Sequence, residues 1–394
     1  MKKIVGSREL IRNINEKNII KEIFEKKETD RTSISKKVSL SGATVTKIVN
    51  EMISKDILVE KGETDSTGGR RPILLSLNKN YGEFIAFKIG MGYINNLITD
   101  FSGEKLYRET FYFEKITEEI IIKHITESLK NEKIKNPISV GIGISGIVNT
   151  KEGCVVNSYI LNLNNFYLGK IIKEETGIDT YIFNDVDSFS MTHYWEGNIK
   201  KYKNSVVMTL GVGIGGSIFI NSEAYNGIGV GEIGHMVIKE NGEKCTCGDN
   251  GCLEAEATFK NIVEMIKKET ESEKLINKYK ELKDTEFSER EFIRLAREED
   301  YKNYKKAFKE YSYLIGIAVK NLINILSPEY FLIGGEALEF KDDFLENTIN
   351  YAVEKSFGKI GRNIVFDTDK LGEDAWTMGV IYKMFDEKIF NLNM

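Results

Sequence analysis

The sequence predicts an α/β protein that carries a separate helical head at its N-terminus. Residues 1–80 contain three amphipathic helical patterns followed by two strand-like runs. After about residue 81, strand-like and helical segments alternate, and glycine-rich turns follow several of the strands. The charge changes at the same place, because residues 1–80 hold 17 Lys and Arg against 11 Asp and Glu, although the whole chain has a formal net charge of −5. We therefore expect two domains, residues 1–80 and residues 81–394.

Composition excludes several classes of protein. The chain is 41% hydrophobic and 29% charged, which is ordinary for a globular protein and unlike a disordered one. No apolar run approaches the roughly 18–20 residues that a membrane span needs. The N-terminus becomes polar too soon for a secretory signal, so we expect a cytoplasmic protein with no membrane partner.

The first 80 residues fit a winged helix-turn-helix. The third helix has apolar residues at a spacing of i, i+3, i+4, i+7 and i+8, and Ser41 is a suitable N-cap for it. Thr32 is the predicted N-cap of the second helix. In order, the expected segments are helices at 8–28, 32–38 and from Ser41 onward, and then strands at 57–60 and 73–77 on either side of a polar wing at 65–72.

The third helix and the wing supply the candidate DNA contacts. Small and hydroxyl side chains near the start of a recognition helix allow a close approach to base edges, and arginines at a wing tip can reach phosphates or a narrow minor groove. The alternative is a helical oligomerisation cap with a charged loop, but the wing sequence Gly68-Gly69-Arg70-Arg71-Pro72 favours DNA. The candidates are Ser41, Thr44, Thr46, Lys47, Arg70 and Arg71.

The sequence predicts that the body consists of strands that alternate with helices. Three glycine-rich turns, at 90–92, 211–216 and 334–335, each follow a strand and can present backbone N–H groups to phosphate. Any one of them also fits a tight turn with no ligand, but together they indicate a nucleotide crevice or its remnant. The expected strands are 84–89, 96–99, 138–144, 181–182, 206–210, 217–220 and 331–333, and the expected helices are 116–130, 168–176, 257–280 and 305–326.

Three of the four cysteines lie within eight residues and predict a metal site. Cys245, Cys247 and Cys252, together with His235, supply three thiolates and one imidazole, which complete a tetrahedral zinc shell with no open position. We therefore expect structural zinc rather than catalytic zinc. The alternative is a loop of reduced thiols next to an unrelated histidine. Cys154 is remote from this cluster and reads as a small hydrophobic residue.

Polar residues near the zinc loop form a candidate sugar site. Asn184 and Asp185 follow a strand, which places them at the ligand crevice of an α/β sheet. Glu232, His235 and Glu254 flank the cysteines. Carboxylate and amide groups suit a polyhydroxyl ligand, because each sugar hydroxyl both donates and accepts hydrogen bonds.

These motifs together resemble the ROK family of repressors and sugar kinases. The resemblance rests on the stretch Leu40–Thr46, the wing, the motif Gly231-Glu232-Ile233-Gly234-His235-Met236 and the pattern from Cys245 to Glu254. It implies a two-lobed, actin-like sugar-kinase (ribonuclease H-like) fold, with one lobe at about 81–195 plus a C-terminal helix and the other at 196–375. It also implies sugar contacts at Asn184, Asp185, Glu232, His235 and Glu254, with Asp185 at the position of the kinase base. A further family sugar contact, an Asn near 157–165, has no clear match.

Three departures from the family pattern speak against catalysis. Lys88 stands where active kinases carry an Asp that helps to organise Mg²⁺, and Val212 replaces a Thr in the second phosphate loop. Asp187 replaces an Asn that is common two residues after the catalytic Asp. We therefore expect no catalytic residues, no enzyme activity and no ATP or Mg²⁺ cofactor.

The resulting hypothesis is a sugar-responsive transcriptional repressor. It would bind double-stranded operator DNA as a homodimer or homotetramer and take a sugar effector between the lobes. One alternative is an active ATP-dependent sugar kinase with an appended DNA-binding head, and another is a zinc-stabilised sugar-binding protein with a vestigial head. The sequence leaves open the identity of the sugar or phosphosugar, the operator sequence, and whether ligand releases DNA or promotes binding.

Overall fold

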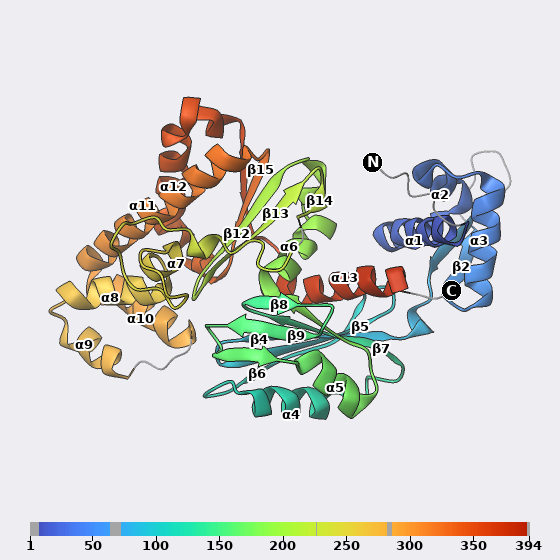
Figure 1. Ribbon diagram of the computed structural model, residues 1–394, viewed down its shortest axis with the longest axis horizontal. Coiled ribbons are helices and arrows are strands. Elements are labelled where there is room, and N and C mark those ends of the chain that lie inside the picture. The colour runs from blue at the N-terminus through green and yellow to red at the C-terminus, as the bar shows by residue number, and fades with distance from the viewer. Residues whose placement is uncertain (1–7, 64–71, 226, 282–285, 392–394) are drawn as a thin grey trace.

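The computed structural model describes residues 8–63, 72–225, 227–281 and 286–391. A small N-terminal head lies at one end of the molecule, beside a body of two α/β lobes (Figure 1). Each lobe is built on a five-stranded sheet with helices packed against it. The predicted α/β class and two-lobed body are therefore confirmed.

The head contains the helices and the antiparallel sheet that a winged helix-turn-helix requires. Its strands pair in the order β1-β3-β2, so that the hairpin of β2 and β3 packs beside the helices. The apolar stripe of the third helix is buried, as its spacing predicted. The elements are α1 (Arg8–Lys26), β1 (Thr29–Asp30), α2 (Arg31–Val38), α3 (Gly42–Ser54), β2 (Leu58–Glu63) and β3 (Ile73–Leu77).

The first lobe has a sheet in the order β11-β7-β4-β5-β6, with different helices on its two faces. Alternate residues of β4 explain this: Ile85 and Phe87 pack with α4 and α5, whereas Phe84 and Ala86 pack with α13. The elements are β4 (Glu83–Gly90), β5 (Tyr93–Asp100), β6 (Lys105–Tyr112), α4 (Glu118–Ser128), β7 (Pro137–Ile144), α5 (Leu168–Thr176) and β11 (Thr180–Asn184), with a small sheet of β8 (Ile147–Asn149), β9 (Cys154–Ser158) and β10 (Leu163–Phe166).

The second lobe repeats the strand order of the first. In both sheets the first three strands form an antiparallel meander, and the next two run parallel to the first strand. This repeat is what a duplicated, two-lobed body requires. The elements are β12 (Ser205–Leu210), β13 (Ile214–Ile220), β14 (Glu223–Ala224), α7 (Leu253–Glu256), α8 (Phe259–Glu269), α9 (Glu273–Lys280), α10 (Glu286–Glu299), α11 (Tyr301–Leu326), β15 (Tyr330–Gly334), α12 (Lys341–Lys355) and β16 (Val365–Thr368).

Two sequence predictions about helices were wrong. The N-cap of α2 is Asp30 and not Thr32, because the Asp30 carboxylate accepts hydrogen bonds from two N–H groups of the first turn. The single helix expected at 257–280 is two helices, α8 and α9. Thr270 takes an extended conformation and ends the first, and the Ser272 hydroxyl caps the second.

Helices α6 (Asp185–Trp195) and α13 (Asp374–Asn391) join the lobes to each other and to the head. They approach so closely that a Cβ on Gly379 would collide with the backbone of Ser188. From the head, the Phe24 ring of α1 stacks on Phe385 of α13 at a centroid distance of 4.0 Å. It also meets Trp195 of α6 edge-on at 5.5 Å. The apolar core of the head is therefore continuous with the body.

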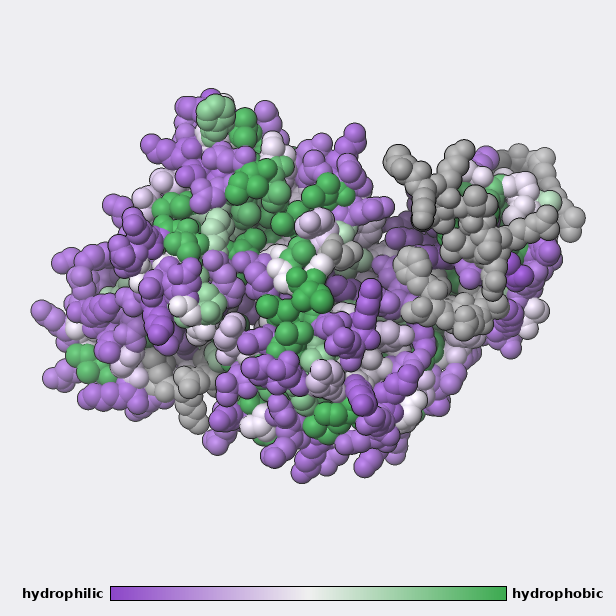
Figure 2. Space-filling view, viewed as in Figure 1, coloured by the Kyte–Doolittle hydropathy of each residue, from purple (hydrophilic) through white to green (hydrophobic). Residues whose placement is uncertain are grey.

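Several of the described helices are amphipathic rather than apolar throughout. The longest of them, α11, has 26 residues and buries one face against α8 and α12, while lysines and glutamate occupy its exposed face. None of the helices in the described segments combines the length and the apolar character of a membrane span. On the face shown in Figure 2, hydrophilic residues cover most of the surface, and a band of hydrophobic residues crosses its middle.

Candidate functional site

A cavity of about 370 Å³ lies between the two lobes. That volume is in the range of small-molecule sites, which is roughly 300–1,000 Å³. Both sheets contribute to it through the ends of their strands and the turns that follow them. All five predicted sugar-site residues line this cavity: Asn184, Asp185, Glu232, His235 and Glu254.

One end of the cavity, which we call the zinc end, is formed by Glu232, His235 and Glu254. The Glu254 carboxylate accepts a hydrogen bond of 2.9 Å from the backbone N–H of Ile214, which fixes one oxygen at the start of β13. Nε2 of His235 lies 4.0 Å from Oε2 of Glu232. Burial raises the pKa of the Glu232 carboxyl, and the nearby carboxylates Glu254 and Asp185 raise it further, while His235 opposes the shift.

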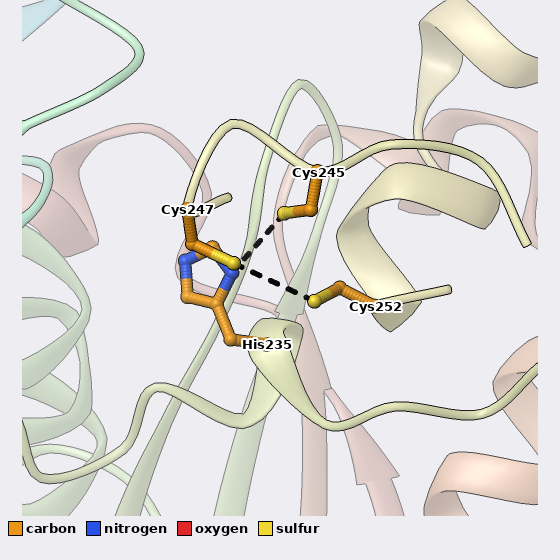
Figure 3. A group of neighbouring side chains, drawn as sticks. All are labelled: His235, Cys245, Cys247 and Cys252. Carbon is orange, nitrogen blue, oxygen red and sulfur yellow. Dashed lines mark hydrogen bonds between the residues drawn. The ribbon is translucent and has the colours of Figure 1, made fainter. Parts of the chain in front are cut away.

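His235 and the three cysteines gather into one cluster beside the cavity (Figure 3). The four ligand atoms all lie within 4.8 Å of one another. Sγ of Cys245 is 3.4 Å from Nδ1 of His235, and Sγ of Cys247 is 3.6 Å from Sγ of Cys252. In a tetrahedral zinc site with these ligands, neighbouring sulfur and nitrogen ligand atoms lie about 3.5–3.8 Å from one another. The residues therefore fit a metal ion of that kind.

The backbone of the loop is shaped for this cluster. Gly251 has a φ of +72°, and a Cβ there would collide with the carbonyl of Lys239, so this turn requires glycine. Burial raises the pKa of the Cys252 thiol, so a thiolate at that position needs a cation beside it. All four cysteines are free, and Cys154 is buried away from the cluster. The expected separation of Cys154 from the metal ligands is therefore confirmed.

Asn184 and Asp185 stand where β11 ends and α6 begins. The Asn184 side chain is the N-cap of α6: its Oδ1 accepts from the N–H of Asp187 at 3.0 Å, and its Nδ2 donates to the carbonyl of Gly146 at 3.0 Å. Asp185 is buried and accepts a hydrogen bond from the N–H of Val186 on Oδ1. Asn184 thus holds the helix start that carries Asp185.

The opposite end of the cavity, which we call the phosphate end, contains Lys88, Asp185, Glu336 and Trp376. Nζ of Lys88 donates to Oδ2 of Asp185 at 2.5 Å and to the carbonyl of Ile89 at 3.2 Å. Both members of this ion pair are buried, with side-chain exposures of 6% and 9%. The same ammonium lies 5.1 Å from the centroid of the Trp376 ring.

The glycine-rich turns surround this end. The turns at 90–92 and 211–216 connect antiparallel pairs, β4 with β5 and β12 with β13, and so they serve as tight hairpins while also lining the cavity. At Gly211 the space beside the backbone is taken by the carboxylate of Glu336, which a Cβ there would strike. Burial raises the pKa of the Glu336 carboxyl, and the positive charge of Lys88 partly opposes that shift. At the phosphate end, the space beside the Gly211 turn is therefore taken by a side chain of the protein itself.

Two cavity residues were missed from the sequence. Oδ1 of Asn157, on β9, is buried and has no hydrogen-bond partner among the described residues, although Asn157 lines the cavity. The Tyr159 ring lies edge-on to His235 at 6.4 Å and is 46% exposed. An Asn was expected between 157 and 165, but only the fold of the small sheet identifies which one faces the cavity.

The predicted DNA contacts lie on the exposed side of α3. Thr46 and Lys47 are exposed. The Ser41 hydroxyl caps the helix by accepting from the N–H of Thr44 at 3.2 Å, as predicted, and the two hydroxyls lie 2.8 Å apart. Arg70 and Arg71 lie outside the described residues.

Known proteins resemble this chain in both sequence and structure. The model of the ROK family matches residues 84–385. A xylose repressor of Caldicellulosiruptor bescii is 30% identical, and the alignment covers 98% of each chain. A glucokinase of Halalkalibacterium halodurans is 28% identical over 61% of this chain and 74% of its own. Among solved structures, a ROK family transcriptional regulator described as a homolog of the E. coli MLC protein has a TM-score of 0.80 at 22% identity, covering 97% of this chain and 98% of its own.

Proposed function

This chain belongs to the ROK family, and from that premise we propose that it is a sugar-responsive transcriptional repressor. The observation that carries this proposal is the continuous packing between the head and the ligand cavity. A recognition helix is useful to a sugar sensor only if the two are mechanically joined, and Phe24, Phe385 and Trp195 join them. Residues 1–80 would read DNA and residues 81–394 would sense the sugar.

The sugar would sit against the zinc end of the cavity. We assign hydrogen bonds with its hydroxyls to Glu232, His235 and Glu254, and to Asn157, whose buried acceptor has no partner among the described residues. Asn184 and Asp185 would contact the far side of the sugar. Zinc, held by His235 and the three cysteines, would supply structure only, by fixing the loop that aims Nε2 of His235 at the ligand.

Sugar phosphorylation is the second candidate function, and the geometry of Asp185 argues against it. A general base must be free to take a proton from the reacting hydroxyl. Here the Asp185 carboxylate is already bound to the Lys88 ammonium, and Glu336 occupies the space beside the Gly211 turn. We therefore propose that the protein has no kinase activity and uses no ATP or Mg²⁺.

A route for the signal runs along two helices. Helix α6 begins at Asp185 in the cavity and ends at Trp195 against the head. Helix α13 begins beside Trp376 at the phosphate end and carries Phe385 to the same aromatic cluster. A sugar that prefers one arrangement of the lobes would shift both helices and so change the position of the head. In a homodimer or homotetramer, that shift would change the spacing of two recognition helices on an operator.

Footprinting tests this function. The zinc-loaded full-length protein is added to promoter fragments from its own genomic neighbourhood, with and without sugars. We expect protection of a palindromic site that at least one sugar alters. Sequence-independent binding only, with a steep dependence on salt, would contradict a specific repressor. A coupled assay with ATP, Mg²⁺ and the same sugars separates the rival function, since sustained turnover would establish a kinase.

A further inference from the structure

A second cavity lies within the first lobe, between helix α4 and the face of the sheet that α4 covers. Its volume is about 320 Å³, which is in the range of small-molecule sites. Strands β4, β5 and β6 line one side of it, and the last turn of α4 with the segment after it lines the other. We call it the α4 cavity. The described residues that line it are all different from those that line the cavity between the lobes.

Aromatic and aliphatic side chains make up much of the wall of the α4 cavity. The rings of Phe87 and Phe111, on the sheet, meet the His124 ring of α4 edge-on at centroid distances of 6.3 Å and 4.6 Å. Tyr107 and Ile98 line the same wall. Aromatic rings pack favourably with a further ring in edge-on or offset arrangements, so this wall favours a flat, apolar body.

Three polar side chains contact one another inside this wall. Asn96 is buried, and its Nδ2 donates to Oγ of Ser128 at 3.0 Å. Its Oδ1 lies 3.1 Å from Nε2 of His124, and because an amide oxygen only accepts, Nε2 carries the hydrogen there. Nε2 also lies 3.3 Å from Oγ of Ser128, but as a donor it cannot accept the hydroxyl hydrogen. That hydrogen is therefore available to an oxygen acceptor in the cavity.

The α4 cavity offers no net charge to a ligand. Burial lowers the pKa of the His124 ring, and Glu127 opposes that shift only in part, so the ring is neutral at neutral pH. Glu127 and Lys130, which also line the cavity, are exposed and have opposite charges. An ionised group placed against the apolar wall would lose its hydration without gaining an opposite charge. A sugar fits less well too, because its many hydroxyls need partners and the Asn96 amide is already paired.

From this arrangement we propose that the α4 cavity binds a small neutral aromatic molecule that carries one hydroxyl or carbonyl oxygen, with Ser128 as the donor to that oxygen. The aromatic body lies among Phe87, Tyr107 and Phe111. This second site goes beyond the proposed function and does not depend on it.

The site is on the opposite face of the sheet from the sugar site. Phe87 lines the α4 cavity, and the next residue of β4, Lys88, lines the cavity between the lobes, because successive side chains of a strand point to opposite faces. A ligand in the α4 cavity therefore binds without displacing a sugar.

NMR of the zinc-loaded full-length protein, isotope-labelled at histidine, tests the proposal. The chain has three histidines, His124, His193 and His235, so the ring signals report on separate places. The probe is benzyl alcohol. We expect it to shift the signals of His124 with a Kd of about 1 mM, and to leave those of His193 and His235 in place. Benzoate, which is charged, should bind at least about tenfold more weakly.

Three variants locate the binding. Ser128→Ala should weaken the binding of benzyl alcohol about fivefold and leave that of toluene, which has no oxygen, within about twofold. Lys130→Trp places a large ring beside the cavity opening and should abolish the binding of both. Glu132→Trp, at an exposed position nearby that does not line the cavity, is the matched control and should change neither.

Several results would overturn the proposal. They are His124 signals that benzyl alcohol does not move, benzoate binding as tight as that of benzyl alcohol, and undiminished binding by Lys130→Trp. Displacement of benzyl alcohol by a sugar that binds the protein would also overturn it, since the probe would then lie between the lobes. None of these results decides whether the protein is a repressor, which footprinting tests separately.

Discussion

The two ends of the cavity between the lobes differ in how they are built and in how they use their polar groups. Asp185 and Glu336 of the phosphate end come just after strands β11 and β15, whereas Glu232, His235 and Glu254 of the zinc end lie in the segment that runs from β14 to α7. At the zinc end, His235 and Glu232 line the cavity with Nε2 and Oε2 4.0 Å apart, and Asn157, which lines the same cavity, has a buried Oδ1 with no partner among the described residues. At the phosphate end, Lys88 and Asp185 bind each other.

This difference supports the proposal that the cavity binds a ligand without catalysing phosphoryl transfer. A ligand site keeps its function when its groups remain available to the ligand, and loses it when they satisfy one another. Lys88 supplies a cation that binds the Asp185 carboxylate. At the zinc end, the proposed sugar contacts remain available to a ligand. The comparison therefore predicts that each end responds differently to mutation.

The largest effect should come from breaking the ion pair of the phosphate end. Lys88→Met leaves the Asp185 carboxylate buried and unpaired, and we expect the free energy of unfolding to fall by about 3–5 kcal/mol. Chemical denaturation of the zinc-loaded protein measures this. The double variant Lys88→Met/Asp185→Asn removes both charges and should recover most of the loss. A Lys88→Met protein as stable as the parent would show that Lys88 and Asp185 do not depend on each other as a buried ion pair.

The next effect is the loss of zinc. Cys247→Ser removes one of the four ligands, so the loop that carries His235 should lose its fixed position. We expect zinc content to fall and sugar affinity to drop about 100-fold, as measured by metal analysis and calorimetry. Cys154→Ser, at a buried cysteine outside the cluster, should retain the zinc and the sugar affinity. Unchanged sugar binding by a zinc-free Cys247→Ser protein would show that zinc is not needed to position His235 for the sugar.

A smaller effect is expected at Asn157, where a substitution should change the sugar affinity but not the stability of the protein. Because its Oδ1 has no partner in the described protein, Asn157→Ala should leave the stability unchanged or slightly higher. Sugar affinity should fall about tenfold, since one hydrogen bond to the ligand is lost. A loss of stability without a loss of affinity would make Asn157 a structural residue and not a sugar contact.

The smallest effect concerns the head, which lies outside both ends. Lys47 is exposed on α3, and Lys47→Ala should weaken operator binding less than tenfold and reduce the salt dependence by about one phosphate contact. Fluorescence anisotropy across a range of salt concentrations measures both. Sugar affinity of the free protein should not change. An unaltered salt slope would place Lys47 away from the DNA backbone.

The parts of this site that depend on neighbouring residues could be predicted from the sequence. The parts that depend on contacts between residues far apart in the chain could not. The metal cluster follows from the spacing of Cys245, Cys247 and Cys252, because one short loop supplies three ligands. The N-cap Ser41 follows from its place before an amphipathic helix. The sequence marks Lys88 as a departure from the family pattern, but its partner Asp185 is 97 residues away, and only the pairing of β4, β7 and β11 brings the two together.

The errors have the same physical origin. Thr32 and Asp30 are both good N-caps, and the choice between them depends on which backbone N–H groups each side chain reaches after folding. The break at Thr270 lies in a sequence with continuous helical character, so only its extended backbone reveals it. Asn157 sits on a short strand, β9, whose pairing places it in the cavity. In each case tertiary context decided among local options that were nearly equal.

The reciprocal coupling between sugar and operator DNA tests the central claim most directly. Operator affinity is measured by fluorescence anisotropy with and without a saturating concentration of a sugar that binds the protein, and sugar affinity is measured with and without operator. Linkage requires that the two affinities change by the same factor. The account predicts a common factor of at least about tenfold, carried by α6 and α13 and diminished in Phe24→Ala. Equal operator affinity in the presence and absence of a sugar that binds the protein would contradict it.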